Sequence, residues 1–315
     1  MLAELEVSAS APGKVILFGE HAVVYGRPAI AAPVSQIRAT ATCVQSSEII
    51  LIAPDLGIKR PLSQTPSDDP LAATIHHFQC AANLPTLPPF TLTVSSQIPI
   101  ASGLGSGAAI SAAIIRAMAQ FFDLTALATD EWVCDLTYEV EKLHHGTPSG
   151  IDNTVVVYEK PVYFVKGQPN RIETFMVKRP LRILIADSGI SSKTIEVVSD
   201  VRRQWEEKTA VFNQLFDGCA TIAIAARSTI AAGNLPQIGR LMTENHRLLQ
   251  KMTVSAPILD NLVNAAMGAG AMGAKLSGAG RGGNVIALVD EGMETAVIQA
   301  LLANGATSVI NSWIK

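Results

Sequence analysis

A glycine- and serine-rich run over Pro99–Ala109 is the clearest candidate for phosphate chemistry in this sequence. It reads Pro-Ile-Ala-Ser-Gly-Leu-Gly-Ser-Gly-Ala-Ala and directly precedes an Ala/Ile-rich stretch with helical character. Glycines let the backbone curl so that its N–H groups point toward phosphate oxygens, and a helix N-terminus adds unpaired N–H groups. The alternative is a turn that is glycine-rich only for tight packing. The run is neither a Walker loop nor the dinucleotide fingerprint.

A second group of chemically capable residues surrounds Gly19 near the N-terminus. Lys14, Glu20 and His21 lie within the apolar segment Ala11–Gly26. A lysine in such a strand-like run is expected to be partly buried and paired, with a solvated surface lysine as the alternative. His21 could bond a carboxylate or hydroxyl of a substrate, or could be satisfied within its own turn.

Two later segments add a carboxylate and another glycine-rich loop. The turn residues of His145–Asn153 place Asp152 on a predicted loop, where it could accept a proton or simply cap a turn. The loop Lys275–Asn284 contains glycines between two predicted strands.

Composition excludes several other classes of protein. The 315 residues are 48% hydrophobic and 16% charged, so a large folded core is expected rather than disorder. The net charge of −3 shows no basic stripe for nucleic acid, and no long uncharged apolar run predicts a membrane span. The four cysteines and the histidines lack metal-ligand spacing. The N-terminus does not resemble a signal peptide, so the cytoplasm is the expected compartment.

Alternating short strands and helices must position these residues. Strands are predicted over 5–11, 14–18, 29–34, 38–44, 48–52 and 90–95, with helices over 69–82, 107–121 and 130–143. A second unit is predicted to begin near Pro180. It has strands over 181–186, 273–276, 285–289 and 308–314, and helices over 194–232 (one or two), 235–250, 256–269 and 293–304.

Three of these segments resemble the signature motifs of the GHMP kinases, in the same order and at similar separations. They are Ala11–Gly26, Pro99–Ala109 and Lys275–Asn284. The similarity extends from Ser8 to the last strand and is closest to the branch of the family that phosphorylates mevalonate. The segments that carry this closer similarity are Gly19–Gly26, Glu141–Asn153, Ser191–Thr194 and Asn245–Gln250.

This resemblance implies an α+β fold of two lobes. An N-terminal, ATP-binding lobe with a left-handed βαβ unit would span residues 1–180, and a ferredoxin-like C-terminal lobe would span 181–315. The implied reaction is ATP-dependent phosphorylation of the primary hydroxyl of mevalonate, giving 5-phosphomevalonate for isoprenoid precursor synthesis, with Mg²⁺ as cofactor. The expected partners are these small molecules, not nucleic acid or membrane. The oligomeric state is open, although many relatives are dimers.

The resemblance also implies a role for individual residues. Asp152 would be the catalytic carboxylate, with Lys14 beside it to favour ionised forms of the carboxylate and of the substrate oxygen. Asp152 would either remove the substrate proton itself or act as an electrostatic partner of Lys14, which would then stabilise the alkoxide. Glu141 and Ser106 would hold the metal. Substrate would contact Lys14, Glu20, His21, Ser149, Asp152 and Thr194. ATP would contact Pro99, Ala101, Ser102, Gly103, Leu104, Gly105, Ser106, Gly107 and Ala108.

Three positions depart from the family pattern. Gly107 stands where a second loop serine usually offers a hydroxyl to the metal, Ala101 replaces a frequent glycine, and Arg281 replaces a glycine of the last loop. Ser106 or water could take over the missing metal ligand. Arg281 could reach a phosphate or project into solvent. Alternative functions are therefore a kinase for phosphomevalonate, homoserine or a sugar, and a non-catalytic nucleotide-binding regulator.

Overall fold

The computed structural model describes residues 5–99, 102–145 and 149–315 of this α+β chain. The chain forms two compact units whose segments interleave along the sequence. The first comprises Met1–Gly13, Ser35–Ile100 and Gly105–Glu159, and the second Lys14–Val34, Ala101–Leu104 and Lys160–Lys315. The long strands β1 (Glu6–Phe18) and β2 (Ala29–Gln45) contribute residues to both units and pair with each other. The lobe boundary near Pro180 stays a prediction.

The first unit is built on a sheet in which strand order differs from chain order. Strands β3 (Ile50–Ala53), β4 (Ile58–Pro61) and β5 (Phe90–Ser96) give the order β4-β3-β5-β2. Strand β5 pairs antiparallel with β2 and parallel with β3. The parallel pair requires a crossover, which contains helix α1 (Pro70–Ala81). The short 3₁₀ turns η2 (Pro54–Leu56) and η3 (Leu62–Gln64) flank β4.

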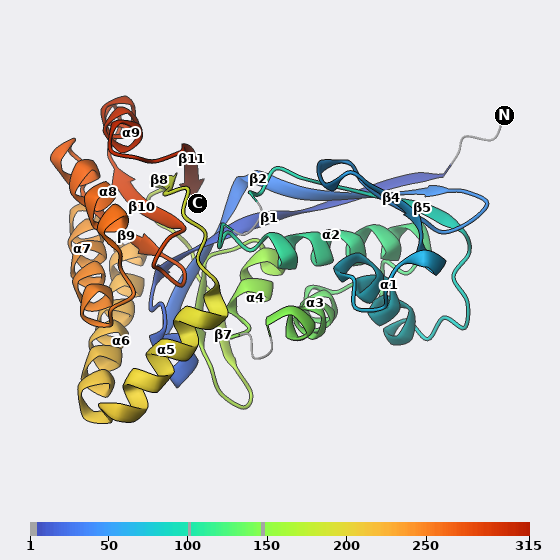
Figure 1. Cartoon of the computed structure of the whole chain (residues 1–315), viewed down its shortest axis with the longest axis horizontal. Helices are drawn as coiled ribbons and strands as arrows, with labels where there is room; N and C mark the ends of the chain where they lie inside the picture. Colours follow the sequence, from blue (N-terminus) through green and yellow to red (C-terminus); the bar gives the residue numbers. More distant parts are fainter. Residues whose placement is uncertain (1–4, 100–101, 146–148) are drawn as a thin grey trace. The chain divides into compact units, whose positions relative to one another are not determined.

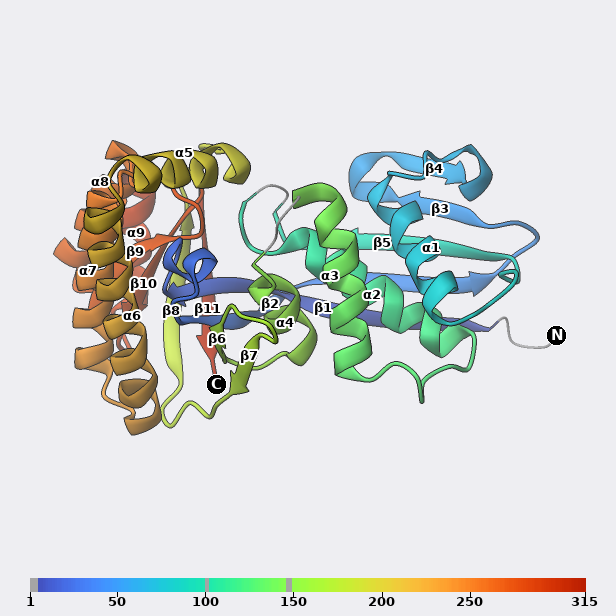
Figure 2. The same ribbon diagram turned by 90° about the horizontal axis from the view of Figure 1, so that it is seen from below.

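Helices cover one face of this sheet. Helix α1 contacts α2 (Ser106–Phe121) and α3 (Asp130–His145), and α4 (Ile151–Tyr158) contacts α2 and α3. Figures 1 and 2 show α1, α2 and α3 on the same side of the strands. Alanine and isoleucine side chains bury most of α2, because small residues let this helix lie close to the strands beneath it.

The second unit contains a four-stranded antiparallel sheet in the order β11-β8-β10-β9. Its strands are β8 (Leu181–Asp187), β9 (Gly273–Ser277), β10 (Asn284–Val289) and β11 (Ser308–Ile314). Strands β6 (Val162–Val165) and β7 (Arg171–Thr174) extend the first part of β2 instead. Helices α7 (Leu235–Lys251) and α8 (Pro257–Gly268) contact β9, and α9 (Glu294–Ala303) contacts β11.

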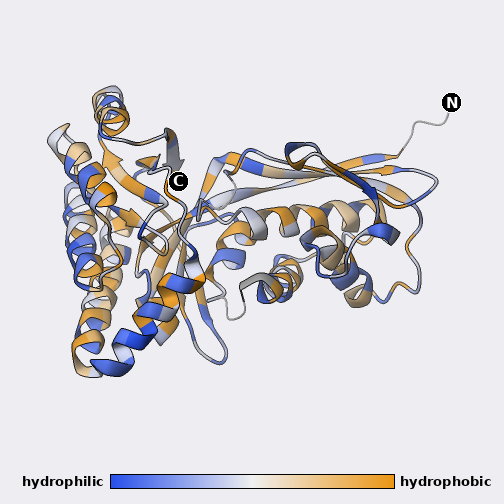
Figure 3. Cartoon of the chain, in the orientation of Figure 1, coloured by the Kyte–Doolittle hydropathy of each residue, from blue (hydrophilic) through white to orange (hydrophobic). Residues whose placement is uncertain are grey.

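Helix α6 (Thr209–Ala232) packs on α7 and on the 3₁₀ turn η1 (Ala22–Tyr25). Among the described residues it is the one helix that is long and apolar enough, by length and composition, to cross a membrane, a test that core helices also pass. Tyr25 stacks on Phe216 of α6 with ring centroids 4.3 Å apart. This packing makes α6 part of the core. Helix α5 (Thr194–Glu207) buries only Val197 and Val201, and Figure 3 shows hydrophilic bands along it.

Most predicted elements are confirmed, with three differences. The first strands predicted over 5–11 and 14–18 form one strand, β1, and those over 29–34 and 38–44 form β2. The prediction that Asp152 lies on a loop is wrong, because Ile151–Tyr158 is helix α4. Its run of β-branched residues, Thr154–Val157, has low helix propensity, and burial of this run overrides that preference. Strands β4, β6 and β7 were not predicted.

Candidate active site

The candidate site residues fall into two groups, one in each unit. Ser106, Gly107, Glu141, Ser149 and Asp152 belong to the first unit. The second unit holds Lys14, Glu20, His21, Thr194 and Ser102–Leu104. Pro99 lies at the end of the first unit's second segment, and Ala101 lies outside the described residues.

Helix α2 begins directly in the glycine run, as predicted. Gly105 precedes it in the left-handed region at φ 76°, a conformation that glycine adopts without a steric penalty. No side-chain cap satisfies the first N–H groups of α2 within the described chain. Unsatisfied N–H groups and the positive end of the helix dipole make this terminus suited to an anion such as phosphate.

The carboxylate of Glu141 lies against the start of α2. Glu141 is 7% exposed, and a Cβ atom built on Gly107 would lie only 2.9 Å from its Oε1 atom. The missing serine side chain therefore leaves space that the Glu141 carboxylate occupies. Among the described residues no set of three or more His, Cys, Asp or Glu side chains gathers around one point. At this helix start the described chain therefore places the Glu141 carboxylate, without a cluster of three or more such ligands.

Helix α4 holds Asp152 in its first turn. Gly150 caps the helix at φ 89°, and the Ser149 hydroxyl accepts a hydrogen bond from the Ile151 amide at 3.3 Å. The side-chain amide of Asn153 donates to the Cys134 carbonyl of α3 at 3.2 Å. These contacts fix the start of α4, and with it the backbone of Asp152, against α3.

The other end of α4 is held by two arginines. Arg38 of β2 makes two hydrogen bonds of 2.9 Å to the Glu159 carboxylate, one to each oxygen. Arg116 of α2 donates to Glu159 at 3.2 Å and to the Val157 carbonyl at 2.6 Å. Because Arg116 belongs to the helix that starts in the glycine run, Glu159 connects α2 to the helix that holds Asp152.

In the second unit, strand β1 brings Lys14 to a buried position. Lys14 is 5% exposed, and its backbone amide donates to the Leu104 carbonyl at 2.8 Å. The side-chain amide of Asn284 donates to the Ser102 carbonyl, so the part of the glycine run in this unit is attached to both β1 and β10. Two further bonds join Ile16 to the Ser277 hydroxyl, at 3.1 and 3.0 Å.

Glu20 forms a buried ion pair with Lys275, a residue that sequence reasoning did not single out. The side chains are 1% and 0% exposed, and Lys275 also donates to the Leu276 carbonyl at 2.6 Å. Burial raises the pKa of Glu20 and lowers the pKa of Lys275, because both charged forms lose water. One Glu20 oxygen, Oε2, has no hydrogen-bond partner among the described residues. The only sequence signal for the pair was a lysine inside an apolar strand-like run.

His21 occupies the centre of a tight γ-turn. The Ala22 amide donates to the Glu20 carbonyl at 2.6 Å, and His21 has φ 60° and ψ −50°. This backbone conformation is rare and strained for a side-chain-bearing residue. Its Nε2 atom bonds the Ala279 carbonyl at 2.8 Å, and burial lowers its pKa to about 4. At neutral pH the ring is therefore uncharged, with Nε2–H donating and Nδ1 as an acceptor.

Arg281, which the sequence left between a phosphate contact and a solvated side chain, is 36% exposed and bonds other residues of the second unit. Its guanidinium pairs with Asp200 of α5 and donates to the Thr253 carbonyl at 3.1 Å. Thr194, the predicted substrate contact, is exposed at the first position of α5.

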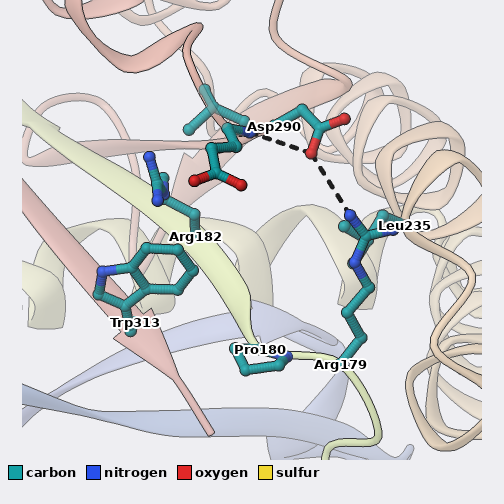
Figure 4. A pocket seen from close by; sticks show the side chains of 8 residues that line it. Arg179, Pro180, Arg182, Leu235, Asp290 and Trp313 are labelled. Carbon is teal, nitrogen blue, oxygen red and sulfur yellow. Dashed lines mark hydrogen bonds and ion pairs between the residues drawn. The ribbon is translucent and has the colours of Figure 1, made fainter.

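A separate pocket lies beside Pro180 in the second unit (Figure 4). The Arg182 guanidinium lies 4.0 Å above the Trp313 ring, and Arg179 pairs with Asp290 at 3.5 Å. None of the predicted site residues lines this pocket. Its lining residues are Arg179, Pro180, Arg182, Leu235, Val289, Asp290, Glu291 and Trp313.

Residues 71–160 match the model of the GHMP kinases N terminal domain, and residues 226–307 match that of the GHMP kinases C terminal domain. The chain is 35% identical over 322 residues to a mevalonate kinase of Thermococcus sibiricus, covering 96% of this chain and 94% of the relative.

Two solved structures are also similar. The L. major mevalonate kinase in complex with R-mevalonate has a TM-score of 0.85 at 27% identity, covering 99% of this chain and 97% of the other. A Streptococcus pneumoniae phosphomevalonate kinase has a TM-score of 0.81 at 16% identity, covering 97% and 99%, a likeness of fold alone.

Proposed function

Because this chain belongs to the GHMP kinase family, we propose that it transfers the γ-phosphoryl group of ATP to the primary hydroxyl of mevalonate. The observation that carries the choice of acceptor is the 35% identity to a mevalonate kinase over 96% of the chain. We further expect the reaction to take place in the cytoplasm, with the oligomeric state open between a monomer and a homodimer.

The chain's own residues supply positioning, charge and a proton acceptor. The N-terminus of α2, with the glycine run Pro99–Ala109, binds the phosphates of ATP. Asp152 accepts the proton of the attacking hydroxyl, and Lys14 stabilises the developing alkoxide. The neutral His21 ring offers Nδ1 to a hydroxyl of the acceptor, since its Nε2–H is bonded to Ala279. Ser149, Glu20 and Thr194 complete the proposed acceptor contacts.

The residues at the start of α2 fit a magnesium ion. Mg²⁺ prefers hard oxygen ligands, needs few protein contacts and keeps several waters. Glu141 and Ser106 supply a carboxylate and a hydroxyl, and Glu141 lies directly against Gly107. A carboxylate beside a phosphate site would repel the ligand unless a cation lay between them, which favours this assignment. The bound metal would neutralise charge on the phosphates.

A panel of acceptors tests the proposal. With ATP and Mg²⁺, the purified chain should convert mevalonate to its 5-phosphate, and should act far more slowly on phosphomevalonate, homoserine and galactose. Product formation followed by ³¹P NMR distinguishes the acceptors directly. Turnover of another alcohol with none of mevalonate would overturn the choice of acceptor. ATP binding without turnover of any acceptor would favour a regulator.

A further inference from the structure

Arg281 joins three segments of the second unit. Its guanidinium pairs with Asp200 of α5, while Nε donates to the Thr253 carbonyl at 3.1 Å. Its backbone amide donates to the Val254 carbonyl at 2.8 Å. Gln204 of α5 also donates to the Thr253 hydroxyl at 2.9 Å. Helix α5, the turn after α7 and the loop 278–283 therefore meet at this one side chain.

The backbone around Arg281 has little freedom to move independently. Arg281 and Thr253 both have positive φ, at 57° and 60°, a region that non-glycine residues rarely adopt. A Cβ atom on Gly280 would lie 2.0 Å from the Val254 carbonyl oxygen, and one on Gly282 would lie 2.3 Å from that of Ile190. The loop 278–283 is thus packed backbone to backbone between two neighbouring turns.

The loop 278–283 bonds His21, a proposed substrate contact, and Ser192, which lies close to Thr194, another proposed contact. His21 bonds the Ala279 carbonyl at 2.8 Å. The Ser192 hydroxyl donates to the Gly280 carbonyl at 2.6 Å, two residues before α5 starts at Thr194. A shift of the loop would therefore move the Ala279 carbonyl, to which the His21 ring is bonded, together with the start of α5.

We infer that Arg281 is a positioning residue that sets the affinity for the acceptor, by holding the loop 278–283 and the start of α5 in one arrangement. This inference rests on the proposed function. Two arginines share Asp200, and their hydrogen bonds lower its pKa to about 2, so the carboxylate stays ionised at all working pH values. The pair with Arg281 is only partly exposed, at 36% and 21% for the two side chains.

The test compares Arg281→Gly with Asp200→Asn. Glycine keeps the backbone at positive φ, so Arg281→Gly removes the side-chain contacts without adding strain. Asparagine keeps the shape of Asp200 and removes its charge. Both variants should raise KM for mevalonate by about tenfold, with kcat within about twofold and KM for ATP unchanged. Arg281→Lys keeps the charge but not the planar, multiple-donor guanidinium, and should retain more of the affinity for mevalonate than Arg281→Gly does.

Arg203→Gln is the matched control. Arg203 pairs with the same Asp200 carboxylate but lies on α5 itself and donates to Glu207, four residues along that helix. Removing it should leave both KM values unchanged. If Arg203→Gln raised KM for mevalonate as much as Arg281→Gly does, general loosening of α5 would explain the effect and the inference would fail.

Two further readouts separate the alternatives. A rise in KM for ATP in Arg281→Gly would make Arg281 a nucleotide contact and overturn the inference. Hydrogen exchange measured without substrates should be faster over 188–196 and 278–283 in both variants, and unchanged exchange would also overturn it. A wild-type chain that fails to phosphorylate mevalonate would refute the proposed function. The exchange experiment would still test whether Arg281 holds the loop 278–283 and the start of α5 in place.

Discussion

Gly107 and Glu141 are matched to each other: a Cβ atom at Gly107 would lie 2.9 Å from the Glu141 Oε1 atom. Only a residue without a side chain leaves the carboxylate where it lies. The position of the Glu141 carboxylate therefore favours glycine at 107, where the family usually has serine. The neighbour it would displace is the end of a flexible side chain, so a substitution at Gly107 should move the carboxylate at little cost in stability.

Gly107→Ala should weaken the response to Mg²⁺. The added methyl group displaces Glu141 and supplies no ligand, so the Mg²⁺ concentration for half-maximal activity should rise about fivefold, the effect of about 1 kcal/mol. Gly107→Ser displaces the carboxylate equally but adds a hydroxyl, and should show a smaller rise. Alanine in a helix should not lower the melting temperature. An unchanged Mg²⁺ titration in Gly107→Ala would argue against Glu141 as a metal ligand.

Asp152→Asn should abolish most turnover while preserving nucleotide binding. Loss of the proton acceptor should lower kcat by about 10³-fold, or about 4 kcal/mol. ATP affinity, measured by titration calorimetry, should change little. Asp135→Asn on the exposed side of α3 is the control and should retain wild-type turnover. A near-normal rate in Asp152→Asn would remove this carboxylate from the mechanism.

Lys275→Met should destabilise the second unit strongly. It leaves Glu20 buried without its partner, at an expected cost of about 3–5 kcal/mol in the free energy of unfolding. The double variant Glu20→Leu/Lys275→Met removes both charges and should recover much of that loss. Urea unfolding of the three proteins checks this. Equal instability of single and double variants would contradict a dominant role for the unpaired charge.

His21 should make stability depend on pH in a defined window. Its pKa falls from 6.5 to about 4 on folding, so the unfolded chain binds the proton more tightly. The contribution of the neutral His21 ring to the free energy of unfolding is fully present above about pH 6.5 and is lost as the pH falls through about 4. His21→Asn removes the titrating ring, and asparagine is one of the residue types that tolerate positive φ.

Unfolding free energies at pH 7.5 and 4.5 provide the comparison. The drop between them should be smaller in His21→Asn than in wild type by about 2–3 kcal/mol. Part of the pH dependence should remain, because burial also lowers the pKa of His246. Identical drops in the two proteins would show that His21 is not held neutral by the fold.

Local patterns predicted the elements, whereas distant partners could not be predicted. The helix start at the glycine run follows from local chemistry, and the structure confirms it. Lys275 lies 255 residues from Glu20, and no periodicity indicates such a pair. The γ-turn at His21 depends on a single backbone conformation that the sequence does not encode by residue type. Whether Lys14 and Asp152 meet, as the family resemblance implies, stays a prediction.

The double attachment of Glu159 has a consequence for the length of α4. An α-helix turns by about 100° per residue, so inserting or deleting one residue between Asp152 and Glu159 would rotate the carboxylate of Asp152 away from its present direction. Arg38 and Arg116 hold the far end of the helix and prevent it from turning back. This stretch should therefore accept substitutions but no change in residue number, unlike the surface turns.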